Sequence, residues 1–548
     1  MKLSHHQIKF LFKIQLWSCM LLLVSCAQIV APTGGTKDII SPKLEQSKPE
    51  NFSVNFQENK ITLFFDEYIQ VKNWNEVIFS PPLTYPLENR IKGKILEVSW
   101  QDTLKENTTY TINFGASVVD NNEGNVLDSN VFVFSTGNTL DTANLSGTLL
   151  KAIDLKPEKN VLVMLYRSNN DSIPYKQLPD YYTRTNEKGK YKISNIKAGS
   201  YKLFALKDNN QNFLFDQPEE AIAFSATRIV IDSNELADLY LFVEESKKLF
   251  VKKATATNYG NATLVFNKPA EKVRFESLRT DISNNNLLAE WNTNNDSLSL
   301  WILGAAPDSL CLKIYDEKEM MDTILLDLPK KDSLENSTNN KITKPFKLMV
   351  NPNANAMIPL GFNQILQLKC NIPLANIDCK KIILYNDKDT LTPTCRFDEN
   401  NKKTLQINYP FNVDSSYQVF IPQGAFSDIL GNLNDTIRFG FTIQKPDFYG
   451  SVSLQVNGLD TTKNAIIQLL DEKQQLVAQT KSIGKNTFKF ENITPGKHLL
   501  KLIIDDNNDG KWNTGKYSEK NQPETIYLYT TPINIKSNWD MELNWELK

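Results

Sequence analysis

Residues 189–203 (GKYKISNIKAGSYKL) decide the fold class of this chain. Tyr191 and Ile193 alternate with polar side chains, which is the period-two pattern of a strand with one buried face. Ile196 then plugs the end of the predicted sandwich, and Gly199 permits the turn into the next strand. The stretch therefore predicts two consecutive strands of a β-sandwich joined by a tight turn.

The same pattern recurs about 300 residues later, in residues 486–502 (NTFKFENITPGKHLLKL). A second pattern, the strand and polar turn of residues 110–125, likewise recurs in residues 417–432. Two patterns repeated at one spacing indicate a two-domain cassette that occurs twice. Between the copies, residues 247–330 carry further strand patterns and predict a diverged sandwich.

Strand patterns fill most of the rest of the chain. Short apolar or alternating runs are separated by turns rich in Asn, Asp and Gly, which is typical of β-sandwiches. Helical periodicity longer than two turns is hard to find in the mature chain. The sequence therefore predicts an all-β chain of tandem β-sandwich domains. Clear strand patterns lie at residues 60–65, 95–100, 131–136, 161–166, 262–266 and 298–302.

The N-terminus carries a leader. Basic residues precede an apolar run over residues 14–24, which is too short for a permanent membrane span. The run leads into residues 23–26 (LVSC), which resemble the bacterial lipobox. The resemblance implies cleavage before Cys26 and acylation of its thiol. Because each buried methylene contributes about 0.8 kcal/mol, acyl chains would anchor the protein to a membrane. An ordinary signal peptide with a chance cysteine is the alternative.

Composition excludes several classes of function. The chain has 61 basic and 63 acidic residues, so nothing suggests a nucleic-acid partner, which would need a concentrated basic face. His5 and His6 lie in the leader, which leaves His498 as the only histidine of the mature chain. His498 follows a turn and is predicted to lie in a strand. Catalytic constellations that need histidine are therefore nearly excluded, and we expect no enzyme.

Three cysteines of the mature chain lie close together, at positions 370, 379 and 395. One interpretation is a disulfide within this segment in an oxidising compartment, with Cys370 and Cys395 as the candidate pair. The alternative, buried free thiols on strands, is at least as well supported. The sequence has no CxxC pattern and no Cys/His ligand spacing, so a zinc site is not expected.

Residues 505–513 (DDNNDGKWN) contain a candidate calcium loop. Asp505, Asn507 and Asp509 offer hard oxygen ligands at positions one, three and five, before a glycine at position six. The loop departs from the EF-hand, because strand residues precede it and Lys516 takes the place of glutamate at position twelve. A hairpin turn stabilised by Asx hydrogen bonds is the alternative, and the low ligand charge favours it. No other cofactor is expected.

Several motifs carry a family resemblance. The first unit resembles the bacterial Ig-like domain of the SbsA type, through residues 64–67 (FFDE), 104–110 (LKENTTY) and the turn at 120–125. The second unit resembles the carboxypeptidase regulatory-like, transthyretin-like β-sandwich. The whole chain is similar to Ig-like-domain lipoproteins of the Bacteroidetes type, whose mature start often carries a stretch like residues 32–38 (PTGGTKD). In the second Ig-like copy, residues 368–371 (LKCN) depart from the FFDE pattern.

The resemblance and the repeat together predict eight segments. In chain order they are a signal peptide (1–25), a tether (26–45), an SbsA-type Ig-like domain (46–138), a regulatory-like sandwich (140–244), the diverged sandwich (247–330), a linker (331–345), a second Ig-like domain (346–445) and a second regulatory-like sandwich (446–548). Because proline and glycine are dense in the tether, it would give the sandwiches reach from the membrane.

These observations predict a lipid-anchored, non-catalytic cell-envelope protein with a structural, adhesive or scaffold role at the outer membrane, held there by acylated Cys26. One rival is a subunit of a multiprotein outer-membrane assembly, with a protein partner. Another is a glycan-binding accessory lipoprotein for polysaccharide uptake. Its sugar-stacking candidates are Trp100, Trp301, Trp512, Trp539 and Trp545, although aromatic residues in sandwiches usually pack cores. Residues 27–30 (AQIV) lack the acid typical of surface-export signals in this bacterial group, which favours the periplasmic face only slightly.

Overall fold

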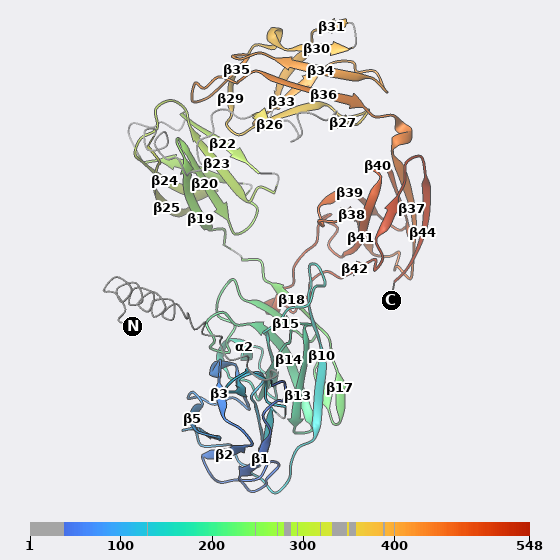
Figure 1. Cartoon of the computed structure of the whole chain (residues 1–548). Coiled ribbons are helices and arrows are strands. Elements are labelled where there is room, and N and C mark those ends of the chain that lie inside the picture. The colour runs from blue at the N-terminus through green and yellow to red at the C-terminus, as the bar shows by residue number, and fades with distance from the viewer. Residues whose placement is uncertain are drawn as a thin grey trace, which may run out of the picture. The chain divides into compact units, whose positions relative to one another are not determined.

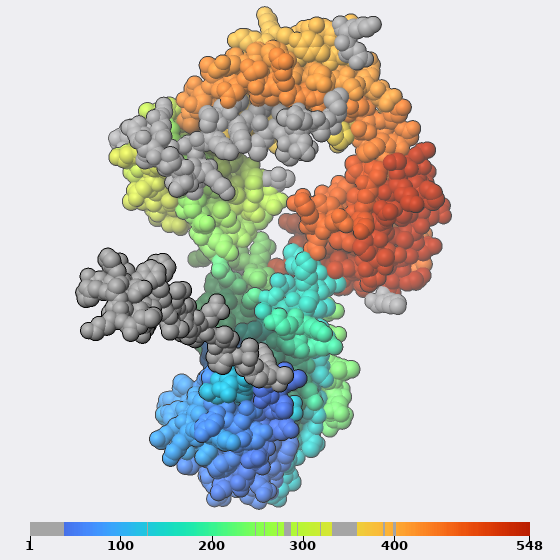
Figure 2. Space-filling model, in the orientation of Figure 1, coloured from blue at the N-terminus to red at the C-terminus, as the bar shows by residue number. Residues whose placement is uncertain are grey.

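The computed structural model describes residues 38–547, with gaps at 129, 247, 271, 279–285, 293, 318, 331–347, 350–357, 387–388 and 399–400. The predicted leader, Cys26, most of the predicted tether and the predicted linker therefore lie outside the described residues. The chain divides into two compact units. Among the described residues, the first contains residues 38–144, coloured blue to cyan in Figure 2, with the short segments Asp180–Tyr182 and Ser194–Ala198. The second contains the rest.

The first unit is a β-sandwich (Figure 1). Its strands alternate as the sequence predicts: in β2, the side chains of Ile61, Leu63 and Phe65 are buried. Packed aromatic rings fill the core, with Phe134 in contact with Phe56, among others. The sheet orders are β1 (Leu44–Lys48)–β2 (Lys60–Phe65)–β6 (Ile95–Ser99)–β5 (Glu88–Lys92), β4 (Ile78–Ser80)–β7 (Thr109–Asn113)–β9 (Val131–Ser135) and β3 (Ile69–Val71)–β8 (Val118–Asp120).

A buried aspartate organises the polar turn that follows β8. The Asp120 carboxylate accepts backbone N–H groups from each of residues 122–125. Burial opposes ionisation of Asp120, but these N–H groups outweigh it and hold its pKa at about 2. Asp428 plays the same part in the repeated unit, where its carboxylate accepts the backbone N–H groups of Leu430 and Asn432. The predicted repeat therefore extends to the hydrogen bonds of this turn.

The opening stretch of the sequence forms β13 (Lys190–Ile196) and β14 (Gly199–Lys207), and Tyr191, Ile193 and Ile196 are buried as expected. The two strands do not pair with each other, because β13 lies at one end of the sheet order and β14 lies beyond β10, β18 and β15. We call this part the second sandwich. Its order is β12 (Tyr181–Arg184)–β11 (Leu162–Tyr166)–β14–β15 (Ala221–Phe224)–β18 (Leu239–Val243)–β10 (Ala143–Lys151)–β13, with β16 (Ile229–Ile231) on β14 and β17 (Asn234–Leu236) on β10.

Two further sheets, formed by β19 to β25, enclose a core of their own, and we call this part the third sandwich. Leu264, Leu298 and Leu310 are fully buried at its core. Its sheets face each other through alternating apolar positions, as the strand patterns predict. They run in the orders β19 (Val251–Asn258)–β20 (Asn261–Phe266)–β23 (Ser297–Ile302)–β22 (Leu287–Trp291) and β21 (Val273–Ser277)–β24 (Ser309–Asp316)–β25 (Glu319–Asp327).

The fourth sandwich repeats the strand order of the first unit. Although residues 368–371 depart from the FFDE pattern, residues 366–370 still form a strand, β28, in the place of β2. The orders are β26 (Leu348–Met349)–β28 (Leu366–Cys370)–β33 (Asn401–Asn408)–β32 (Thr394–Asp398), β27 (Ile358–Leu360)–β36 (Ile437–Ile443)–β34 (Ser416–Ile421)–β30 (Ile383–Asn386)–β31 (Asp389–Leu391) and β29 (Leu374–Ile377)–β35 (Phe426–Asp428).

The final sandwich repeats the turn of the second. Asn195 and Asn492 stand at matching positions and share a left-handed backbone, with φ of 59° and 57°, which asparagine tolerates. The strand orders of its two sheets are β40 (Thr487–Ile493)–β37 (Gly450–Asn457)–β44 (Asp540–Glu546) and β39 (Leu476–Ser482)–β38 (Asn464–Leu470)–β41 (Gly496–Asp505)–β42 (Ile526–Leu528), with β43 (Ile533–Ile535) on β41.

In the described part of the chain, no helix has the length and apolar character needed to cross a membrane.

Candidate functional site

The candidate calcium loop forms a tight turn at the end of β41. The Asp505 carboxylate accepts the backbone N–H groups of Asp509 at 3.1 Å and Gly510 at 2.9 Å. The Asn507 side chain accepts the N–H of Asp509 at 3.1 Å, and Asp509 accepts the N–H of Lys511 at 3.0 Å. The oxygens that a calcium ion would use therefore take part in Asx-type hydrogen bonds within the loop.

Glu524, which sequence reasoning missed, completes this loop from its far end. Its carboxylate accepts the backbone N–H groups of Asp506 and Asn513, both at 2.9 Å. Burial raises the pKa of Glu524, and the nearby charges of Asp505 and Asp509 raise it further. Among the described residues, no group of three or more His, Cys, Asp or Glu side chains is arranged to hold a metal ion. The calcium site stays a prediction.

The second sandwich contains the same loop in a shorter form. Asp208 accepts the backbone N–H groups four and five positions later, as Asp505 does, and the fully buried Glu220 takes the place of Glu524. Twelve positions separate Asp208 from Glu220, whereas nineteen separate Asp505 from Glu524. The loop of the final sandwich is therefore seven residues longer. A comparison of the two copies could have found both glutamates and the insertion.

The longer loop inserts a tyrosine into the second sandwich. Tyr517, in the short 3₁₀ turn η5 (Tyr517–Glu519), is only 2% exposed. Its ring centroid lies 5.1 Å from that of Phe224, 5.3 Å from that of Phe204 and 5.9 Å from that of Tyr175. These three rings come from β15, β14 and the one-turn helix α2 (Ile173–Lys176). We call the contact of residues 514–522 with the second sandwich the clasp.

Polar contacts surround the aromatic centre of the clasp. Burial raises the pKa of Tyr517 to about 12, with the charge of Asp171 adding to it, so the hydroxyl remains a hydrogen-bond donor. The contacts are Tyr517 hydroxyl to the Asp171 carbonyl (2.8 Å), Tyr517 N–H to the Glu244 carboxylate (2.5 Å), Thr514 hydroxyl to the Val243 carbonyl (2.7 Å), Gln522 amide to the Phe224 carbonyl (2.9 Å) and an ion pair of Lys520 with Asp171 (3.0 Å).

Gly515 allows the clasp to approach its partner closely. A Cβ atom at this position would lie 2.7 Å from the ring of Phe242 and 2.8 Å from backbone atoms of Asn521 and Pro523. Real Cβ contacts do not come this close, and two of the three atoms belong to the backbone, which cannot move aside easily. Asn521 and Pro523 belong to the same loop as Gly515, whereas Phe242 belongs to the second sandwich. A side chain at position 515 would therefore distort the loop and disturb its contact with Phe242.

A second contact joins the same two sandwiches. Leu155, held in a left-handed backbone with φ of 53°, packs against apolar side chains on the outer face of β38, β41 and β42. Lys501 donates to the carbonyl of Ile153 at 2.7 Å, and burial lowers its pKa. The consecutive apolar residues of β38 could have predicted this contact from the sequence, because a strand that is buried on both faces does not alternate between apolar and polar residues. The cluster consists of Ile466, Ile503 and Ile526, and both Leu155 and Trp512 pack against it.

The cysteines correct one prediction. Cys395 pairs with Cys379 (Cα–Cα 5.8 Å), so the candidate pair Cys370–Cys395 is wrong. The reason is the sheet order: β33 lies between β28, which carries Cys370, and β32, which carries Cys395. Two strand spacings, about 10 Å, exceed the reach of a disulfide. Cys370 is a buried free thiol whose pKa burial raises to about 12, and Cys311 is a half-exposed free thiol.

His498 lies in β41, as the sequence predicts. It is 5% exposed, and its Nε2 atom lies 3.0 Å from the carbonyl oxygen of Thr494, four residues earlier. The side chain is therefore enclosed within the final sandwich, at the turn that Gly496 begins. This position fits a structural role.

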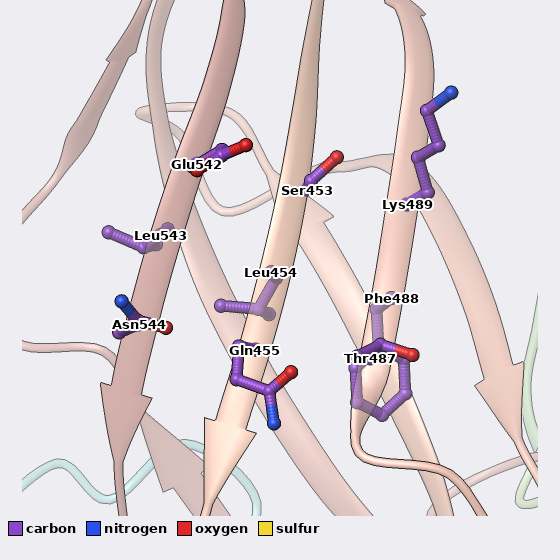
Figure 3. A pocket seen from close by; sticks show the side chains of 9 residues that line it. All are labelled: Ser453, Leu454, Gln455, Thr487, Phe488, Lys489, Glu542, Leu543 and Asn544. Atoms are coloured by element: carbon purple, nitrogen blue, oxygen red, sulfur yellow. The ribbon is translucent and has the colours of Figure 1, made fainter.

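The outer face of the three-stranded sheet of the final sandwich is hollowed. Figure 3 shows Ser453 on the central strand β37, with Lys489 on β40 and Glu542 on β44. The hollow has a volume of about 380 Å³ and is open to solvent. A neighbouring hollow of about 410 Å³ shares Lys489 and is lined by Tyr449 and Trp539. Sequence reasoning considered Trp539 but not the polar face beside it.

Comparison with known proteins supports the Ig-like resemblance. Residues 38–136 match the family model of the bacterial Ig-like domain. This match covers β1 to β9 of the first unit. A search of curated proteins finds no match for the chain.

Solved structures of low similarity also match. The TIE protein of Bacillus anthracis is 10% identical, with 94% of this chain and 76% of that chain covered and a TM-score of 0.15. The major pilin subunit of Bacillus cereus is 10% identical, with 74% of this chain and 99% of that chain covered and a TM-score of 0.14. Native α-2-macroglobulin of Escherichia coli is 13% identical, with 52% and 98% covered and a TM-score of 0.18. Scores this low assign no function.

Proposed function

We propose that this chain is a lipid-anchored, non-catalytic scaffold of the bacterial cell envelope, placed at the outer membrane. The clasp is the observation that supports a scaffold. Interfaces between domains of one chain are usually polar and allow motion unless they are large and apolar. Here a fully enclosed tyrosine, a separate isoleucine patch and several hydrogen bonds join two sandwiches that are far apart in the sequence. Such a contact suits a protein that holds its surfaces at fixed positions.

The anchor in this proposal is Cys26. It rests on the lipobox-like residues 23–26 and on the short apolar run before them. With an acylated Cys26, the tether would place the sandwiches at a distance from the membrane that its length limits. The scaffold then offers loops and sheet edges to a protein partner at the outer membrane, because contacts of this class gather at loops and unpaired strands.

The anchor and the scaffold are tested by separate variants, and Cys26→Ala tests the anchor. The full-length protein, expressed with its leader in a Gram-negative host, should fractionate with the outer membrane, and Cys26→Ala should release it. Cys311→Ala is the matched control and should stay membrane-bound, because Cys311 lies in the third sandwich. If Cys26→Ala remained in the membrane fraction, the anchor would be excluded.

A tagged pull-down from mild-detergent extracts tests the scaffold. We expect a defined partner with the wild type and a reduced yield with Tyr517→Ala, which loosens the clasp while it leaves Cys26 unchanged. Complete absence of partners in repeated extractions of the wild type would contradict the scaffold. The anchor experiment would stand unaffected by that result.

A further inference from the structure

The outer face of β40, β37 and β44 is polar at every position that the strand register brings together. Thr487 and Lys489 of β40, Ser453 and Gln455 of β37, and Glu542 and Asn544 of β44 form two rows of three across the sheet. The apolar residues between them, such as Leu454 and Phe488, are buried on the opposite face. An uncovered sheet face that carries hydroxyl, amide, amine and carboxylate groups offers hydrogen bonds in many directions.

A furrow runs along the part of the central strand where the outward side chains, those of Ser451 and Ser453, are short. Ser453 lies between the long side chains of Lys489 and Glu542, and Ser451 lies beside Asp540, to which its hydroxyl donates. The furrow continues from the hollow in Figure 3 into the neighbouring one, which shares Lys489. Its walls are therefore polar and its floor is formed by small residues.

An exposed tryptophan stands at one end of the furrow. Trp539 is 56% exposed, whereas Trp100, Trp301 and Trp545 are at most 5% exposed. In the described part of the chain it is the only tryptophan with more than half of its surface in solvent. Tyr449 lines the same hollow. A lone exposed ring needs no explanation, but an exposed ring beside a polar furrow provides a stacking surface next to hydrogen-bonding groups.

The second sandwich serves as an internal comparison. The parallel pairing of β10 with β18 matches that of β37 with β44. Gly147 and Gly450, where an added Cβ would clash with the backbone of the paired segment, mark equivalent positions. When the two sandwiches are aligned through these glycines and strand pairs, Leu150 of the second sandwich corresponds to Ser453 of the final one. In the same alignment, Ala237 corresponds to Trp539. The small floor and the exposed ring therefore belong to one copy of the repeat and are not required by the fold.

The charge of the furrow limits what it could bind. Lys489 is paired with Glu491 at 2.5 Å, and the ammonium group of Lys536 lies 5.7 Å from the centroid of the Trp539 ring. Against these two lysines stand the carboxylates of Asp447, Asp540, Glu542 and Glu546, so the face and its hollows carry an excess of negative charge. Excess negative charge repels anionic polymers such as nucleic acids and acidic polysaccharides. A neutral, hydroxyl-rich chain meets no such penalty, because carboxylate and amide oxygens accept hydrogen bonds from hydroxyl groups.

We infer that this furrow binds a neutral oligosaccharide chain, with one sugar ring stacked on Trp539 and the following rings along Ser451 and Ser453. Sugar hydroxyls bond to the amide and carboxylate groups of Gln455, Asn544 and Glu542, and the apolar face of a pyranose ring covers the exposed indole. The binding is non-covalent, and no group of the protein is consumed. The inference does not depend on the clasp, because the furrow lies on the sheet that β38 and β41 do not join.

Native gels that contain a polysaccharide test this inference. The full-length protein in mild detergent is run through gels with dextran, laminarin, xylan or galactomannan, and through a heparin gel as the acidic comparison. We expect at least one neutral polysaccharide to retard the wild type. Trp539→Ala removes the stacking surface, and Ser453→Tyr fills the furrow. Each variant should weaken the retardation at least about tenfold.

Tyr240→Ala is the matched control, because Tyr240 is exposed on the corresponding face of the second sandwich and should leave the retardation unchanged. Trp539→Ala removes a side chain that lies mostly in solvent, so folding should be unaffected even if Ser453→Tyr disturbs the sheet. The inference fails if no neutral polysaccharide retards the wild type, if heparin alone does so, or if Trp539→Ala migrates as the wild type does.

Discussion

The hydroxyl of Tyr517 donates a hydrogen bond of 2.8 Å to the backbone carbonyl of Asp171, which lies 346 residues earlier in the chain. This bond joins two copies of a repeated sandwich through a loop whose seven-residue insertion only the later copy possesses. The insertion thus converts a repeat of the sequence into an asymmetric pair, in which one copy supplies the tyrosine and the other supplies the pocket.

Removing the ring of Tyr517 should open the clasp. By analogy with large-to-small substitutions of buried aromatic residues, Tyr517→Ala should cost about 3 kcal/mol or more, which corresponds to roughly 100-fold faster hydrogen exchange in the strands that it covers. The measurement is hydrogen exchange in Ala221–Phe224 of the intact protein. Tyr517→Phe should lose about 1 kcal/mol, the worth of one hydrogen bond. Unchanged exchange in Tyr517→Ala, with Tyr240→Ala as control, would disprove the clasp.

The close approach at Gly515 gives a second test of the same contact. Gly515→Ala should weaken the clasp by about 1–3 kcal/mol, because overpacking forces backbone shifts. The expected sign is again faster exchange in Ala221–Phe224, together with cleavage of residues 514–522 under limited proteolysis. Gly304→Ala is a control, since a Cβ at Gly304 meets nothing within 4 Å, although its φ of 98° adds local strain. Equal protection in Gly515→Ala and wild type would contradict this prediction.

Stability of the first unit should depend on pH through Asp120. Its pKa of about 2 lies below the ordinary value of 3.8, because four N–H groups stabilise the carboxylate and outweigh the effect of burial. A carboxyl group with a lowered pKa in the folded state stabilises the fold fully above its unfolded pKa, and this contribution disappears as the pH falls from about 4 toward 2. Asp120→Asn should therefore be less stable at neutral pH and lose this dependence, as followed by hydrogen exchange in Val118–Asp120 between pH 2 and 5.

The cysteines should differ in reactivity. Iodoacetamide should modify the half-exposed Cys311 in the native protein and Cys370 only after unfolding, because burial raises the pKa of Cys370 and blocks access. Peptide mapping without reduction should recover Cys379 joined to Cys395. Cys379→Ala should destabilise the fourth sandwich by about 3 kcal/mol, the value expected for a loop of about 15 residues. A Cys370–Cys395 peptide in the map would overturn this assignment.

Calcium distinguishes the two interpretations of the Asp505 loop. A calcium site would stabilise the final sandwich by about 2.7 kcal/mol at a calcium concentration of 100 times Kd. We expect no shift of the unfolding midpoint, because Asp505, Asn507 and Asp509 already accept hydrogen bonds within the loop. Asp505→Ala should destabilise the loop by about 1–3 kcal/mol without calcium, since it removes the charged acceptor of the backbone N–H groups of Asp509 and Gly510. A calcium-dependent rise in the midpoint that Asp505→Ala abolishes would establish the metal site.

Local patterns in the sequence were enough to predict the strands. Alternation placed Tyr191 and Ile193 on the buried face, and the polar turn after Asp120 recurred with its hydrogen bonds after Asp428. These features depend on neighbours within a few residues, so a pattern of period two and a set of turn residues specify them. The departure at residues 368–371 did not matter, because the strand needs buried apolar positions and not a particular motif.

The disulfide and the glutamate at the end of the loop could not be predicted in the same way. Sequence proximity suggested Cys370 with Cys395, but the strand between them in the sheet places Cys379 in reach instead. Glu524 lies nineteen positions after Asp505, too far for a spacing rule of the EF-hand kind. Both outcomes depend on the order in which strands pair, and strand order is a property of the whole sheet.

The sequence by itself determined the all-β character of this protein, the repeated cassette and the lipobox-like Cys26, because each of these resides in a short stretch of residues. Only the tertiary structure decided that Tyr517 enters the second sandwich and that Ser453 and Trp539 share one face. The physical reason is that local patterns specify which side of a strand is buried. What covers that side, and what lies beside it on the neighbouring strand, depends on residues hundreds of positions away.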